Sequence, residues 1–120
     1  MQNNQRKERR WIRYYLSGLE QTLAAELGCA LDGHGCRVVN NPRSADILFC
    51  APKPQVLESA LRQAAGRPVI AVSRIPETSL WLDALEAGAA DYYAAPFENL
   101  HIRWMLDRHC GRQAAARAVA

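Results

Sequence analysis

The chain has 120 residues, of which 49% are apolar and 22% charged, and its formal net charge is +3. This length suits one domain with a buried core, and no apolar run approaches the roughly 20 residues that a membrane-spanning helix needs. The first ten residues, MQNNQRKERR, lack the apolar segment of a secretory signal. We therefore expect a globular protein of the cytoplasm with no membrane partner.

Positive charge is concentrated at the start of the chain. Residues 1–13 hold five basic side chains and one acid, whereas the remaining residues hold ten basic and eleven acidic ones. A short charge run of this kind is usually a solvated end. We expect residues 1–10 to form a disordered basic tail, and nucleic-acid binding through this tail ranks below the other hypotheses.

Strand and helix patterns alternate after this tail. Aromatic and β-branched runs predict strands, and apolar residues at steps of three and four predict amphipathic helices that end at glycines. The predicted strands are residues 11–16, 36–39, 47–50, 69–73 and 92–94, and the predicted helices are residues 19–32, 54–65, 78–87 and a last one around 100–106.

Two of these helices have apolar side chains that we expect to face the core. In the predicted helix at residues 78–87 these are Leu80, Trp81, Ala84 and Leu85. In the last helix they are Leu100 or Ile102, followed by Met105 and Leu106.

The third and fourth predicted strands, ILFC and VIAVS, are continuous apolar runs. Such runs are typical of parallel strands that are covered on both faces. The alternation of five strands with helices predicts an α/β fold, a flavodoxin-like doubly wound sheet of five parallel strands in the order 2-1-3-4-5.

One connection is too short for this topology. Only seven residues separate the second and third predicted strands, whereas a parallel crossover normally takes a dozen or more. We therefore expect the second helix to be shortened or missing. An antiparallel second strand at the edge of the sheet would explain the same shortness.

The residues that most often carry chemistry are scattered. The four cysteines show no CxxC spacing, which favours reduced thiols over a zinc site or a disulfide framework. His34 with Cys36, and His109 with Cys110, are weak candidates for metal ligands. No nucleophile triad, HExxH, GxGxxG or P-loop pattern occurs. We expect no metal, no cofactor and no enzyme activity.

The second half of the chain resembles a known family. The segments PVIAVS and ALEAGAADYYAAPF, within residues 68–97, resemble the receiver domain of two-component response regulators (CheY-like domains). In that family an apolar strand ends in Thr or Ser, a helix closes with an A-G-A-like turn, and D-Y-x-x-K-P-F follows. The resemblance implies a receiver-like domain over residues 11–110, followed by a flexible tail over residues 111–120.

Receiver chemistry, as the resemblance implies it, is phosphoryl transfer to an aspartate after the third strand. Acids after the first strand hold Mg²⁺, and a lysine meets the phosphoryl charge, because the arriving dianion must be neutralised. In this sequence Ala51, or Cys50 if the register shifts by one, stands at the acceptor position. The resemblance thus implies a degenerate phosphorylation pocket, consisting of Ser17, Gly18, Ala51, Ser73 and Ala95.

Two residues match the conformational part of the family's pattern. Ser73 matches the hydroxyl that binds the phosphoryl group, and Tyr92 matches the aromatic whose rotamer reports activation. Each has a simpler interpretation, because a strand-end serine often caps local backbone and aromatics are common on sheets.

We therefore expect a pseudo-receiver that takes part in two-component or phosphorelay signalling without being phosphorylated. It would bind a protein partner or form a homodimer through the face formed by the helix at residues 78–87, the fifth strand and the last helix, where Trp81, Glu98 and Arg103 are the candidate interface residues. The alternative is a small-ligand or nucleotide-binding domain that uses the crevice at the carboxyl ends of the strands.

Overall fold

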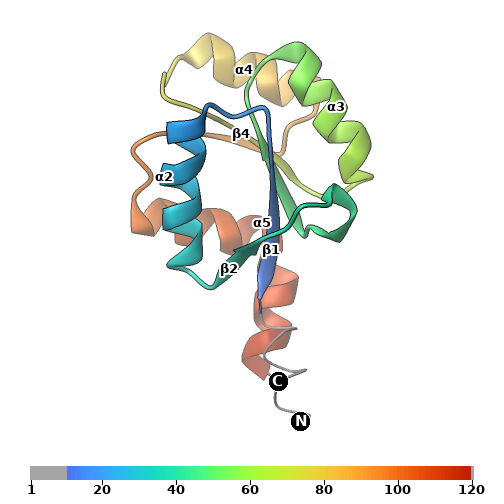
Figure 1. Cartoon of the computed structure of the whole chain (residues 1–120), viewed down its shortest axis with the longest axis vertical. Helices are drawn as coiled ribbons and strands as arrows, with labels where there is room; N and C mark the ends of the chain where they lie inside the picture. The colour runs from blue at the N-terminus through green and yellow to red at the C-terminus, as the bar shows by residue number, and fades with distance from the viewer. Residues whose placement is uncertain (1–10, 120) are drawn as a thin grey trace.

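The computed structural model describes the backbone of residues 11–119 and the side chains of residues 11–111, so the expected tail over residues 1–10 lies outside it. Ten elements follow one another along the chain (Figure 1). They are β1 (Ile12–Ser17), α2 (Gln21–Asp32), β2 (Cys36–Val38), the 3₁₀ turn η1 (Pro42–Ser44), β3 (Ile47–Cys50), α3 (Pro54–Ala64), β4 (Val69–Ser73), α4 (Thr78–Ala87), β5 (Asp91–Ala94) and α5 (Asn99–Val119).

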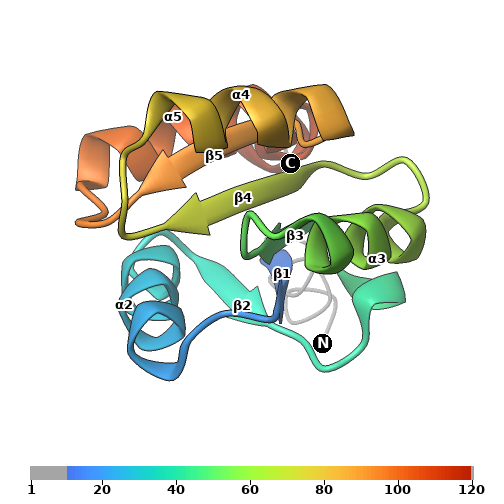
Figure 2. The same ribbon diagram turned by 90° about the horizontal axis from the view of Figure 1, so that it is seen from above.

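The sheet has the predicted order β2-β1-β3-β4-β5, and each neighbouring pair of strands is parallel. Helices cover both of its faces (Figure 2). One core cluster joins Ile47 and Phe49 of β3 to α2 and α5, and the other joins Leu48 and Cys50 to α3 and α4. The flavodoxin-like fold predicted from the sequence is therefore confirmed.

The central strand β3 explains why a continuous apolar run was the right signal for this fold. All four of its side chains are fully buried, and they alternate between the two core clusters. A strand covered on both faces needs apolar residues at every position rather than at every second one.

The short connection between β2 and β3 has a geometric cause. β2 is parallel to β1, so the antiparallel alternative is wrong. Val38, the last residue of β2, and Ile47, the first residue of β3, both pair with Tyr14 of β1. The chain therefore has no strand to travel back along and only steps across β1, about 10 Å at the usual strand spacing. The short turn η1 is sufficient for that step. This confirms the prediction that the helix between the second and third strands is shortened or missing.

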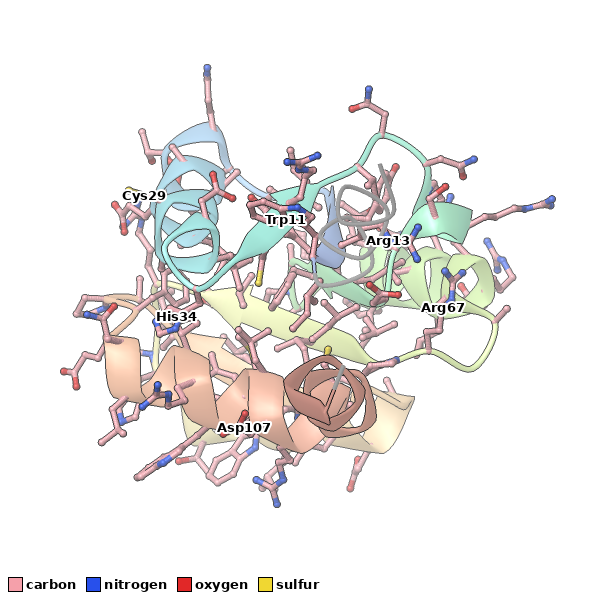
Figure 3. All side chains as sticks on the ribbon, turned by 90° about the horizontal axis from the view of Figure 1, so that it is seen from below. Trp11, Arg13, Cys29, His34, Arg67 and Asp107 are labelled. Atoms are coloured by element: carbon pink, nitrogen blue, oxygen red, sulfur yellow. The ribbon has the colours of Figure 1, made fainter. Side chains whose placement is uncertain are left out.

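Arg67 holds this connection in place. Its guanidinium donates hydrogen bonds to the carbonyl oxygens of Arg43 and Ala45 around η1, and to those of Gln63 and Ala64 at the end of α3. In Figure 3 Arg67 lies beside α3 at the end of the molecule where β1 begins. One side chain thus binds carbonyl groups around η1 and at the end of α3, where a helix leaves its last carbonyl groups without internal partners.

The orientation of α4 differs from the expectation. Of the four side chains predicted to face the core, Ala84 is the one that is buried, whereas Trp81 and Leu85 are 46% and 36% exposed. Leu82 is 52% exposed as well. The reason is that apolar residues occur almost all around this helix, so their spacing did not define a single buried face.

In α5 the core position is Ile102 rather than Leu100, and Met105 and Leu106 are buried as expected. The helix bends at Cys110, whose φ of −125° and ψ of 20° are not helical, and then continues to Val119. The predicted flexibility of residues 111–120 stays a prediction. No helix within residues 11–119 is long and apolar enough to cross a membrane.

We predict that Arg67→Lys destabilises the fold by about 1–3 kcal/mol, because an ammonium cannot reach carbonyl groups on two segments as a planar guanidinium does. Arg62→Lys is the matched control, since Arg62 is 70% exposed and forms a surface ion pair with Glu58, and it should change stability by less than about 0.5 kcal/mol. Urea denaturation followed by circular dichroism measures both. Equal losses in the two variants would contradict the role assigned to Arg67.

Candidate functional site

The five residues of the predicted pocket meet at one edge of the sheet. The ladder pairs Ser17 with Cys50, directly before Ala51, and Ser73 with Ala94. The amide of Ala95 donates to the carbonyl oxygen of Ser73 at 2.8 Å. This is the carboxyl edge of the strands, where open α/β sheets bind ligands.

An apolar side chain fills the part of this edge that follows β1. Gly18 has a φ of +68°, and a Cβ atom added to it would lie 2.8 Å from Cγ1 of Val56. Val56 belongs to the first turn of α3, and it is partly buried against the core. A hydrocarbon group therefore packs where the resemblance would place carboxylate ligands for Mg²⁺, and such ligands must be oxygen atoms.

The end of β3 offers no acceptor for a phosphoryl group. Ala51 is 9% exposed and has no reactive atom. Cys50, the alternative in a shifted register, is fully buried, and burial raises the pKa of its thiol to about 11. Since the thiolate is the reactive form of cysteine, Cys50 is a neutral core residue at physiological pH.

Glu20, the acidic residue that follows β1 most closely in the sequence, is bound by other side chains. The Glu20 carboxylate accepts hydrogen bonds from the Thr22 hydroxyl at 2.8 Å and from Arg74 at 3.4 Å, and both lower its pKa. Arg74 also pairs with Glu26 at 3.0 Å, and this contact is the main reason why the pKa of Arg74 is raised. We call these contacts the Arg74 bridge. It joins the loop after β4 to α2, and therefore spans the carboxyl end of β3, which lies between β4 and β1.

Ser73 and Tyr92 both bind the backbone of Ile75. The Ser73 hydroxyl oxygen accepts from the Ile75 amide at 3.0 Å, and the Tyr92 hydroxyl donates to the Ile75 carbonyl oxygen at 2.6 Å. Ser73 therefore caps local backbone, and Tyr92 is a partly buried aromatic that packs on the α3 and α4 side of the sheet. Both simpler interpretations describe the contacts that the structure shows, and together they fix the loop between β4 and α4.

The three candidate interface residues do not share one surface. Trp81 is exposed on α4 and Glu98 is exposed before α5. Arg103 lies on the other side of α5, where it lines a shallow cavity of about 400 Å³ together with His34 at the end of α2. Figure 3 shows His34 between α2 and α5. Arg103 thus faces α2 rather than α4, a detail that the sequence spacing alone did not reveal.

One ion pair was missed because its members are distant in the sequence. Asp91 begins β5, and its carboxylate lies 3.1 Å from Nε2 of His109 on α5. The Asp91 carboxylate also lies 3.8 Å from Arg108. Burial and the nearby Asp91 raise the pKa of Tyr93. Within residues 11–111 no group of three or more His, Cys, Asp or Glu side chains is placed to hold a metal ion.

The fold is that of a response-regulator receiver domain, and comparison with solved structures supports this. A protein from Chloroflexus aurantiacus assigned as a response regulator superposes with a TM-score of 0.68 and 20% identity over 85% of this chain and 99% of that one. NtrX from Brucella abortus superposes with a TM-score of 0.69 and 16% identity, and the match covers 91% of this chain and 29% of NtrX. CpaE from Burkholderia thailandensis, assigned to pilus assembly, superposes with a TM-score of 0.69 and 19% identity, and the match covers 83% of this chain and 98% of CpaE. No protein-family model and no curated protein sequence matches the chain.

We predict that Gly18→Ala destabilises the domain by about 2–4 kcal/mol. Holding alanine in a left-handed backbone conformation costs about 1 kcal/mol, and overpacking of its methyl group against Val56 costs about 1–3 kcal/mol more. Gly35→Ala is the control for the backbone alone, because Gly35 has a φ of +80° and nothing within 4 Å of its Cβ position. In the Gly18→Ala, Val56→Ala double variant the overpacking should disappear. Chemical denaturation of all variants measures this, and non-additivity of the two changes is the expected signature.

Proposed function

We propose that this protein is a pseudo-receiver: a receiver-like signalling domain that is not phosphorylated and has no enzyme activity. It acts by binding another protein, or a second copy of itself, through the face formed by α4, β5 and α5. One observation carries the proposal. Val56 of α3 packs against Gly18 at the edge where a receiver would hold its metal, and the acceptor and lysine positions are alanines.

The remaining features of that edge support the same function. Phosphoryl transfer to a receiver domain uses a carboxylate acceptor, a metal and a cation, because the charge of the phosphoryl group must be balanced as it arrives. Ala51 and Ala95 supply neither an acceptor nor a cation, and Arg74, the cation that lies near, is paired with Glu20 and Glu26.

A protein surface is supported by the exposure of large apolar side chains. Trp81 and Leu82 of α4, and Trp104 of α5, are each between 46% and 57% exposed. Two exposed tryptophans in a domain of this size are unusual for a surface that meets only water, and aromatic residues are enriched where proteins bind each other. The small-ligand alternative gains no comparable support, since Val56 occupies part of the crevice that it needs.

The phosphorylation pocket can be tested by two-dimensional amide NMR during titration with Mg²⁺ and then with beryllofluoride, which mimics a phosphoryl group on an aspartate. We predict no saturable shifts for the amides of Ser73, Ile75 and Tyr92, because none of the five pocket residues carries a carboxylate that could bind either addition. Saturable shifts confined to that edge would show a working acid pocket and overturn the proposal.

A matched variant makes a negative result informative. In Ala51→Asp the acceptor carboxylate is restored but the acids for Mg²⁺ are still absent, so we expect this variant also to remain silent. A known functional receiver, treated in the same way, is the positive control for the reagents. Shifts in the wild-type protein that persist in Ala51→Asp would indicate a binding site other than the one considered.

A further inference from the structure

Helix α4 belongs to the most acidic part of the sequence. Residues 75–100 contain five acids, namely Glu77, Asp83, Glu86, Asp91 and Glu98, and no Lys, Arg or His. The other 94 residues hold all fifteen Lys and Arg side chains against seven acids. The whole chain has a net charge of +3, but the segment that contains α4 is negatively charged. Such an asymmetry favours positively charged partners for this segment.

Three of these acids lie on or beside α4, and this helix carries no basic residue. Glu77 precedes the helix, and Asp83 and Glu86 are exposed on it. The nearest cation along the chain, Arg74, is directed to α2 and is paired there with Glu20 and Glu26. The carboxylates of α4 therefore have no cation on their own helix.

Apolar side chains form a stripe on the same helix. Trp81, Leu82 and Leu85 lie within about 100° of one another around the helix axis, and all three are exposed. In Figure 1 α4 lies along the top of the molecule beside α3, and no described element covers its outer side. Glu86 follows Leu82 by four residues, so a carboxylate borders the stripe. We call the surface of Trp81, Leu82, Leu85 and Glu86 the α4 stripe.

The charge of the α4 stripe argues against a symmetric dimer built on it. In a two-fold contact each copy presents the same surface to the other, so Asp83 and Glu86 of one copy would lie close to the same acids of its partner. Like charges across an interface are costly when water is excluded. A partner with basic residues beside an apolar stripe meets no such cost.

We propose that the α4 stripe binds an amphipathic helix of another protein whose apolar residues are flanked by Lys or Arg. This rests on the proposed function and specifies the partner of its α4 face. The apolar side chains of the partner cover Trp81, Leu82 and Leu85 in the way that helices bind grooves and helix faces, while its basic side chains pair with Asp83 and Glu86. Trp81 is the expected hot spot, since tryptophan commonly carries a large share of interface energy.

Two synthetic helical peptides of about 14 residues, roughly four turns, test this inference. Both carry leucines along one face, flanked by lysines in the first peptide and by glutamates in the second. Fluorescence anisotropy of the labelled peptides with the full chain should show saturable binding of the lysine peptide, weakening as salt is raised, and no binding of the glutamate peptide. Trp81→Ala should weaken the lysine peptide about tenfold or more, and Glu86→Lys should weaken it as well.

Val38→Ala is the matched control, because Val38 is an apolar residue that is 52% exposed on β2, at the opposite edge of the sheet from β5; it should leave the affinity unchanged. Equal binding of both peptides, or an equal loss in Val38→Ala, overturns the charge-selective α4 stripe. Sedimentation velocity distinguishes a failure of the charge-selective α4 stripe from a failure of the proposed function. A wild-type dimer that Trp81→Ala dissociates overturns the basic partner but retains a pseudo-receiver that acts through α4. If Trp81→Ala and Leu82→Ala alter neither self-association nor peptide binding, then both proposals fail.

Discussion

The constraint on which this structure depends is the complete burial of β3. Its four side chains are inaccessible to water and divide between two core clusters, one beneath α2 and α5 and the other beneath α3 and α4. A strand in this position can carry no unpaired polar group without a large cost in free energy. In this chain β3 ends with Cys50 and is followed by Ala51, so the edge of the sheet that it reaches is neutral where a receiver would be charged.

The topology could be predicted from the sequence because buried parallel strands leave a strong signal, but the short link after β2 could not be explained from it. The difficulty lay in assuming that β2 and β3 start at the same level. They are staggered, so that Val38 and Ile47 meet the same residue of β1, Tyr14. Stagger depends on pairing between distant segments, and hydrophobic periodicity does not report it. The same limit applies to Arg67, whose four carbonyl partners come from two separate segments.

The sequence places the residues of the candidate site after the ends of parallel strands, but it does not reveal their contacts. The absence of the acceptor, the acids and the lysine could be read directly from Ala51, Gly18 and Ala95. Nothing in the sequence indicated that Val56 packs on Gly18, because the two residues come from different elements and neither spacing nor composition links them. The outward rotation of α4 was missed for another reason: a helix with apolar residues nearly all around it has no single preferred face until the sheet and α3 select one.

The loop after β4 shows how the neutral edge and the α4 surface are connected. In a pocket that binds a dianion, the ligand itself can order the surrounding loops. Here the contacts come from the protein: Ser73 and Tyr92 hold the two backbone groups of Ile75, and Arg74 is tied to α2 by two carboxylates. Since α4 begins three residues after Ile75, its position is specified without an ion at the edge of the sheet. The stripe of Trp81, Leu82 and Leu85 is therefore presented by the fold itself, which is what the proposed binding of a partner without a phosphoryl signal requires.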